Sequence, residues 1–585
     1  MKAISEVLSE IVGDAFAACG YDRTLGAVTV SDRLDLCQFQ CNGAFGGAKL
    51  YHKAPLIIAG EVAARLNGNG VFARAEAVRP GFVNLVLDDR FFVDRANVMA
   101  ADPYVGVPQA ERPETIVIDY GGPNVAKPLH IGHLRSAIIG EALKRLARAT
   151  GNTVYGDVHF GDWGLPIGLV LAELEARHPD WRCFAPDFDS AADPVPALDV
   201  ETLNEVYPFA SAKSKRDGVF AARAHEMTVM LQSRDAGCLA LWKEIMRVSV
   251  ADVRRIYDIL DVRFDLWYGE SDADAYVPEL LGVLQGKGLL RESDGAQVVD
   301  VAEETDKAPM PPVIVKKSDG SIGYATTDLA TILLRQRDCA PARIWYVVDK
   351  RQLLHFTQVF RCAKKAGLVP LETELAHFGF GTLNGSDGKP FKTRDGGVMR
   401  LDDLLETVIG AAAQKLKASE FVRQDDGETA RRVGIAAIKF GDLSNQLAKD
   451  YIFDIDKFLS FEGKTGTYLL YTVTRIHSIL KKAGVEQDAS LSLRGVYTEA
   501  ERTLLLRLLL TGDMFRKAME EKAPSILCDS AYQLAAAFSG FYHDCRIIDE
   551  PDADKRATWL ALAVLTRRAL CKHLEVLGIE TVENM

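Results

Sequence analysis

The stretch TIVIDYGGPNVAKPLHIGHLRSAIIGEALKRLARATGNTVYGDVHF, residues 115–160, decides the fold of this chain. A β-branched run at 115–120 predicts a strand, and the apolar row Leu134, Ile138, Ala142 and Leu146 predicts a helix over 129–150 that Gly151 ends. A second strand is expected from TVYGDVHF at 153–160. Strand, helix and strand within about 45 residues form a βαβ unit, so we predict an α/β domain with a Rossmann-type, doubly wound parallel sheet.

The sequence on either side of this unit has a different character. Before it, an amphipathic helix at 54–66 and a strand after the Pro80-Gly81 turn indicate a small α+β appendage. Between about 180 and 265 the chain reads as a polar helical insertion, and strand-like segments return at 297–301, 312–316, 343–348 and 375–380. Beyond Arg400 we predict an α-helical bundle with helices at 402–418, 430–443, 467–483, 499–521, 524–543 and 557–577.

Composition excludes several classes of protein. Hydrophobic residues are 48% and charged residues 26% of the 585, close to the globular average, which excludes disordered and fibrous proteins. There is no apolar run of about 18 residues and no targeting pattern at the start, so we expect a cytoplasmic protein without membrane contact. The ten cysteines are scattered, so neither a disulfide framework nor a metal site is expected. The net charge of -12 argues against indiscriminate polyanion binding but allows a local phosphate-binding surface.

The tetrapeptide His130-Ile131-Gly132-His133 opens the predicted helix. Two histidines three positions apart share one helix face, and a helix start attracts phosphate through its unpaired N–H groups. Gly132 should leave room for a ligand to approach closely. The alternative is a chance pair of helix histidines, but the strand–loop–helix context favours nucleotidyl transfer.

A second motif, GKPFKTRDGG at 388–397, places Lys389, Lys392 and Arg394 among glycines. Ammonium groups on such a loop can stabilise charge that develops on a triphosphate. Alone, this pattern is more typical of a solvated basic loop. Together with the histidine motif it favours a catalytic role.

These two motifs, followed by a helical C-terminal region, resemble the class I aminoacyl-tRNA synthetases. Further segments resemble the arginyl-tRNA synthetase family: PNVAKPLHIGHLRSAIIG, GDWG, GYATTDLA, DKRQLLHFTQVF, FEGKTGTYLLYTVTRIHSI, CNGAFGGAKL, RPGFVNLVL and a terminal Met585. The resemblance covers the whole chain. It implies ATP-dependent ligation of L-arginine to tRNA(Arg) through arginyl-adenylate, with release of AMP and pyrophosphate and with Mg²⁺ accompanying ATP. It also implies a tRNA-contacting domain at 1–110, a catalytic domain at 111–400 and an anticodon-binding domain at 401–585, and we expect a monomer.

The resemblance implies roles for individual residues. The catalytic residues would be His130, His133, Lys389, Lys392 and Lys127, the last matching a family lysine thought to substitute for the loop lysine where that is missing. ATP would contact His130, Gly132, His133, Lys389 and Lys392. The amino and carboxylate groups of arginine would contact Asp119, Gly122, Pro123, Asn124 and His133, and its guanidinium would contact Tyr324, Asp328 and Gln352. One departure is Gly121-Gly122, where many relatives have Ser-Ser, so that only backbone contacts remain.

The guanidinium pocket also follows from side-chain chemistry. Tyr324 and Asp328 are four positions apart and face the same way if GYATTDLATILLR is helical. A carboxylate can accept two N–H groups of a guanidinium in bidentate fashion. A phenol can contact its flat face or hydrogen-bond to it, and the Gln352 amide can accept a remaining N–H. The alternative is that Asp328 is an ordinary charge on a helix surface.

The outer domains carry candidate tRNA contacts. Tyr468, Tyr471 and Arg475 lie on one predicted helical stripe and can stack on bases or bind phosphate, although a buried aromatic stripe is the alternative. Met585 is a further candidate in the helical region. Asn42 and Phe45 are candidates for contact with the tRNA elbow.

Three other functions remain open at this level. The chain could be a class I synthetase for another amino acid or a catalytically silent tRNA-binding paralogue, but silent paralogues usually lose a signature His or Lys that is present here. A small-metabolite nucleotidyltransferase also uses HxGH, yet it would not need a helical C-terminal region of about 180 residues.

Overall fold

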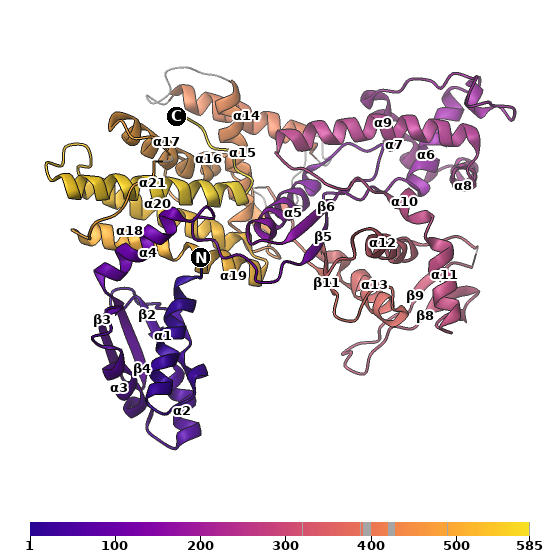
Figure 1. Cartoon of the computed structure of the whole chain (residues 1–585). Coiled ribbons are helices and arrows are strands. Elements are labelled where there is room, and N and C mark those ends of the chain that lie inside the picture. The colour runs from indigo at the N-terminus through magenta and orange to yellow at the C-terminus, as the bar shows by residue number, and fades with distance from the viewer. Residues whose placement is uncertain (319, 386–387, 390–398, 419–426, 488, 584) are drawn as a thin grey trace.

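The structure is a computed structural model that describes residues 1–585 except 319, 386–387, 390–398, 419–426, 488 and 584. Figure 1 shows a sheet with its helices at the N-terminal end, a group of long helices above it, and a second group of helices on the opposite side of the molecule. Among the described helices, none is both long and apolar enough to cross a membrane.

The N-terminal part is an antiparallel sheet covered by helices, as the α+β prediction required. Its strand order is β1-β2-β4-β3, and β4 alternates buried and half-buried residues, which is typical of a sheet with one face on a core. The predicted helix at 54–66 and the predicted strand after Gly81 correspond to α3 and β4. The elements are α1 (Ile4–Ala18), η1 (Arg23–Gly26), β1 (Val28–Val30), β2 (Phe39–Cys41), α2 (Gly43–Tyr51), α3 (Pro55–Leu66), β3 (Phe72–Val78), β4 (Phe82–Leu87) and α4 (Asp89–Ala101).

The N-terminal part is held to the C-terminal helices by polar contacts at the start of α1. This helix has no side-chain cap of its own; instead Asp513, a residue of α19, accepts the N–H groups of Ile4 (3.2 Å) and Ser5 (3.3 Å). The amino group of Met1 pairs with Asp102 at 3.1 Å. A carboxylate at a helix start satisfies unpaired N–H groups and complements the helix dipole, so Asp513 stabilises the helix and the docking together.

A parallel sheet of order β11-β10-β5-β6 lies at the centre, which confirms the predicted fold class. Its strands are β5 (Thr115–Tyr120), β6 (Thr153–Asp157), β10 (Arg343–Val347) and β11 (Glu374–His377). Helix α5 (Ile131–Ala149) connects β5 to β6. Ile116 and Ile118 belong to the same core as α5, whereas Val117 belongs to a second core with α12 (Tyr324–Cys339) and α13 (Leu353–Ala366). Helices therefore cover both faces of the sheet.

Two of the strand-like segments form a different sheet. β8 (Ala296–Val299) and β9 (Val313–Lys316) pair antiparallel with each other, and β7 (Arg291–Ser293) completes a separate three-stranded sheet. Residues of β9 alternate buried and exposed, while β10 is buried almost throughout. A strand with one exposed face suits an antiparallel sheet at the surface, and a continuously buried strand suits the parallel sheet.

The predicted insertion is helical and lies to one side of the parallel sheet (Figure 1). It contains η2 (Arg182–Phe184), α7 (Val200–Ser214), α8 (Gly218–Gln232) and α9 (Ala236–Ile259), packed on α6 (Leu165–Arg177). The short α10 (Glu270–Asp274) and α11 (Val277–Gly286) follow.

The C-terminal part is a group of packed helices near the predicted bounds. The predicted helix at 499–521 is in fact two helices, which meet at Leu510. The helices are α14 (Leu401–Ala418), α15 (Gly427–Leu443), α16 (Ile455–Phe458), α17 (Gly466–Lys482), α18 (Glu499–Leu509), α19 (Thr511–Glu521), α20 (Pro524–Asp544) and α21 (Ala553–Val576). Two short strands, β12 (Leu383–Asn384) and β13 (Tyr451–Ile452), pair in parallel next to them.

Candidate active site

The two motif histidines cap the start of α5. His130 is the N-cap, and its Nδ1 accepts the N–H of Gly132 at 3.0 Å. The Nδ1 of His133 accepts the N–H of His130 at 3.1 Å, and the two rings are 4.0 Å apart. Burial lowers the pKa of His133 to about 3; burial, followed by the charge of Lys127, lowers the pKa of His130. Both rings are therefore neutral at pH 7, and the tautomer that fits these bonds leaves Nε2–H as a donor.

Gly132 lies close to the ring of His130, and its predicted contact with ATP stays a prediction. A Cβ atom at this position would lie 2.7 Å from Cε1 of His130. The missing side chain thus makes room for the His130 ring.

The loop between β5 and α5 is shaped by close backbone contacts. Gly121 has a φ of +70°, and a Cβ at Gly122 would lie 2.2 Å from the carbonyl oxygen of Val158. A serine at 122 would not fit this backbone. Asn124 forms an isolated β-bridge with Gly161 of the GDWG segment, where a Cβ would lie 2.1 Å from the Asn124 Oδ1.

Asp119 has a buried partner that sequence reasoning missed. Arg335 of α12 donates to Oδ2 of Asp119 at 2.6 Å and to Oδ2 of Asp157 at 2.5 Å. The Arg335 side chain is fully buried, and that of Asp119 is 13% exposed. A buried charge needs a counter-charge, so Arg335 fixes two carboxylates at the ends of β5 and β6. An arginine inside the apolar run ATILLRQR was the available signal.

The predicted guanidinium residues lie at the start of α12 and just before α13. The segment containing Tyr324 and Asp328 is helical, as predicted, and Tyr324 is its exposed first residue. The Nε2 of His355 bonds to Oδ2 of Asp328 at 2.5 Å. Gln352 is exposed at the end of η3 (Lys350–Gln352). The structure thus adds His355 as a contact of Asp328.

Glu270 is a further acidic residue that the sequence did not single out. It is the first residue of α10, and burial, then the charges of Asp162 and Asp328, raise its pKa to about 7. Partial burial and then Glu270 raise the pKa of Tyr324. The carboxylates of Glu270 and Asp328 and the Tyr324 phenol are therefore within electrostatic range of one another, which suits a cationic ligand.

Residues on either side of the second motif are hydrogen-bonded to α5 and to the segment just before it. Beyond the motif, the N–H of Ile131 donates to the carbonyl of Met399 (3.1 Å), and the N–H of Leu401 donates to the carbonyl of Leu129 (2.9 Å). Before the motif, Arg135 of α5 donates to the carbonyl of Gly381 at 2.7 Å. Lys389 follows Gly388, and its carbonyl accepts the N–H of Gly385; Lys392 and Arg394 lie outside the described residues.

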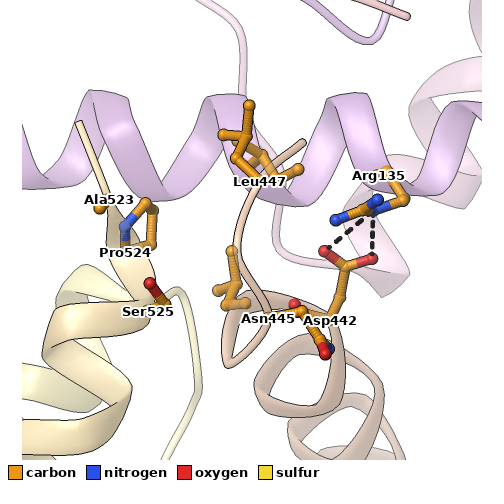
Figure 2. A pocket seen from close by; sticks show the side chains of 9 residues that line it. Arg135, Asp442, Asn445, Leu447, Ala523, Pro524 and Ser525 are labelled. Atoms are coloured by element: carbon orange, nitrogen blue, oxygen red, sulfur yellow. Dashed lines mark hydrogen bonds and ion pairs between the residues drawn. The ribbon is translucent and has the colours of Figure 1, made fainter. Parts of the chain in front are cut away.

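Arg135 also joins α5 to the C-terminal helices. Its Nε donates to Oδ2 of Asp442 in α15 at 3.1 Å (Figure 2). Its Nη1 donates to the Lys449 carbonyl at 3.0 Å. Tyr451 donates to the same carboxylate at 2.9 Å. The two charged side chains are 2% and 0% exposed, and burial raises the pKa of Asp442 although Arg135 opposes this.

Three protein-family descriptions match the chain. They are the class I (R) tRNA synthetase catalytic domain at 96–455, the DALR anticodon-binding domain at 469–585 and the arginyl-tRNA synthetase N-terminal domain at 2–87. The chain belongs to the arginyl-tRNA synthetase family. It is 46% identical to an arginine–tRNA ligase of Agathobacter rectalis and 44% identical to one of Hyphomonas neptunium, with full coverage of both chains in each case.

Solved arginyl-tRNA synthetases have the same fold. The enzyme of Plasmodium falciparum aligns with a TM-score of 0.82 at 24% identity, and that of Thermus thermophilus aligns with a TM-score of 0.80 at 23% identity. Each alignment covers 100% of both chains.

The candidate tRNA contacts of this synthetase lie in two places. On α17, the Tyr468 hydroxyl bonds to Ser539 at 3.0 Å, and the Arg475 guanidinium lies 5.5 Å from the Tyr471 ring and 4.9 Å from the Tyr542 ring. These side chains are half-buried between α17 and α20, so they both pack and present an edge to solvent.

The other candidates differ in accessibility. Asn42 is exposed at the start of α2, and the Phe45 ring meets Phe82 at 5.0 Å. Met585 is only 9% exposed and belongs to the large hydrophobic core, and its predicted tRNA contact stays a prediction.

Proposed function

We propose that the chain charges tRNA(Arg) with L-arginine in two steps at the start of α5. The arginine carboxylate attacks the α-phosphate of ATP, forming arginyl-adenylate and releasing pyrophosphate. A ribose hydroxyl of the terminal adenosine of tRNA then takes the arginyl group, and AMP leaves. Neither step requires a nucleophile from the protein, so catalysis rests on positioning and charge stabilisation.

One observation carries the assignment of the chemistry to this place: the segment that bears the signature lysines is hydrogen-bonded on both sides to the start of α5. The Nε2–H groups of His130 and His133 donate to the phosphates, and Lys389, Lys392 and Lys127 stabilise the charge that develops on them. Mg²⁺ enters with ATP as part of the substrate. Among the described residues, no cluster of three carboxylate, histidine or cysteine side chains is arranged to hold a resident metal ion.

Arginine is recognised at its two ends. Asp119, Asn124 and the backbone of Gly122 and Pro123, together with His133, hold the amino and carboxylate groups. Asp328, Tyr324 and Gln352 receive the guanidinium, and Glu270 adds a second carboxylate that becomes fully ionised when the cation binds.

Transfer RNA contacts both outer parts of a monomeric, cytoplasmic enzyme. The anticodon region binds the domain at 401–585 through Tyr468, Tyr471 and Arg475, and the elbow meets the domain at 1–110 near Asn42 and Phe45. Stacking on aromatic rings and phosphate contacts by arginine are the chemistry that such RNA surfaces use.

The test is attachment of labelled amino acids to total tRNA by the purified chain with ATP and Mg²⁺. We expect arginine alone to be attached. Attachment of another amino acid would assign a different specificity, and attachment of none would favour a silent tRNA-binding protein.

A further inference from the structure

The helical insertion reaches the loop that carries Lys127. Tyr207, a half-buried residue of α7, faces this lysine, whose Nζ lies 4.3 Å from the centre of the tyrosine ring. In the described part of the chain, no carboxylate lies within ion-pair distance of Lys127. The ring is therefore the group that meets the ammonium, and a cation at this distance from an aromatic face is attracted to it.

A second contact from the insertion holds the backbone next to Lys127. Ala126 has a left-handed conformation with a φ of 58°, and its N–H donates to the hydroxyl of Ser249 in α9 at 3.1 Å. Such a conformation is costly for a residue with a side chain and persists only where neighbours hold it. Ala126 and Ser249 are both buried, so the insertion fixes the backbone through α9 and meets the side chain through α7.

The ammonium held in this way belongs to the active site. The charge of Lys127 contributes to lowering the pKa of both His130 and His133, so it lies near the proposed phosphate site. Burial, then Glu270 and then Tyr207 raise the pKa of Tyr324, so Tyr207 and Tyr324 lie within electrostatic range of each other.

We propose that Tyr207 is a positioning residue, whose ring holds the Lys127 ammonium where it meets the charge that develops on ATP during arginine activation. The proposal rests on the function proposed above. Because the lysine acts on the phosphates, loss of the ring should lower kcat and leave the KM for arginine nearly unchanged.

The experiment measures arginine- and tRNA-dependent ATP–pyrophosphate exchange by the full chain. Tyr207→Leu should lower kcat by roughly 3- to 30-fold, the range of a partly desolvated cation–ring contact, and change the arginine KM by less than twofold. Tyr207→Phe keeps the ring and should stay within twofold of the parent. Phe209→Leu is the matched control, because Phe209 is an exposed residue of the same helix whose ring lies 5.2 Å from Arg177, and it should have no effect.

A double variant tests whether Tyr207 acts through the lysine. Once Lys127→Met has removed the ammonium, Tyr207→Leu should cause no further loss. If the two losses multiply, or if Tyr207→Phe is as damaging as Tyr207→Leu, the positioning role is wrong. A Tyr207→Leu chain with parental kcat would also overturn it.

Replacement of Tyr207 by pentafluorophenylalanine separates the ring's charge distribution from its shape. This ring has nearly the same size but a reversed quadrupole, so the fold is retained and kcat should fall as in Tyr207→Leu. If Tyr207→Leu does not fold, the pentafluorophenylalanine variant provides the test. A parental kcat in the pentafluorophenylalanine variant would refute the proposal. If the parent chain itself shows no arginine-dependent exchange, the proposed function fails first.

Discussion

The buried ion pair between Arg135 and Asp442 gives a prediction whose size follows from the structure. The change Asp442→Asn leaves the guanidinium, 2% exposed, without its counter-charge. Arginine cannot release its proton at any pH that the fold survives, so the loss should be about 3–5 kcal/mol in the free energy of unfolding. For a folding unit of 150–250 residues, this corresponds to a fall in Tm of roughly 6–20 °C. The measurement is calorimetry of the parent and variant chains.

The opposite change, Arg135→Met, should behave differently with pH. The Asp442 carboxyl then has no cation, and its pKa, already raised by burial, rises further. Because the folded-state pKa lies above the unfolded value of about 4, the protonated acid is favoured in the fold, and stability is lost as pH rises towards the folded pKa. The loss in Arg135→Met should therefore be smaller at pH 5 than at pH 8. Asp442→Asn removes the titrating group, so its loss should not grow from pH 5 to pH 8.

The control is the exposed pair Arg291–Asp300, which is 2.8 Å long with side chains 50% and 56% exposed. Asp300→Asn should cost less than about 1 kcal/mol. If Asp442→Asn lowers Tm no more than Asp300→Asn does, the view that this pair holds α5 to α15 is refuted.

Four further predictions concern catalysis. Lys392→Ala should lower the kcat for adenylate formation by roughly 100- to 1,000-fold, and a kcat within threefold of the parent would show that this lysine does not act on ATP. Asp328→Asn should weaken arginine binding by about 2–5 kcal/mol with little change in the KM for ATP; equal rises in both would indicate damage to the fold. Since the pKa of Glu270 is raised to about 7 and the ionised form binds the cation, the KM for arginine should fall from pH 6 to pH 8, and Glu270→Gln should flatten this dependence. If tRNA bound to the C-terminal helices is coupled to the site at the start of α5, exchange of pyrophosphate into ATP should require arginine tRNA, and full exchange by nuclease-treated enzyme without tRNA would contradict the coupling.

Periodicity in the sequence was enough to place the main elements of the catalytic domain. The apolar row from Leu134 to Leu146 predicted a helix at 129–150, and α5 spans Ile131–Ala149. The spacing and the kind of apolar residues predict these elements, because a helix buries one face and a strand of a parallel sheet is buried on both faces. They do not say which strands share a sheet. β8 and β9 pair in a separate sheet, and only β9 of these two alternates buried and exposed residues.

The candidate site was predicted in its residue types but not in its contacts. Arg335 lies 216 positions from Asp119, and His355 lies 27 positions from Asp328. Local sequence spacing does not predict such contacts, because these residues meet only when different strands and helices pack together. The capping role of His130 was missed for a related reason: it depends on the backbone direction at the helix start, which a spacing of three does not reveal.

The capping of α1 by Asp513 has a consequence for synthesis on the ribosome. Ser5 and Asp513 are separated by 508 positions, so at about 5–20 residues per second the N-terminal segment waits roughly 25–100 s for its partner. During that time, the N–H groups in the first turn of α1 must bond to water or to another acceptor. The β1–β4 sheet must be stable without the contact to Asp513. The cap on the first turn of α1 can therefore form only after at least 513 residues have been made.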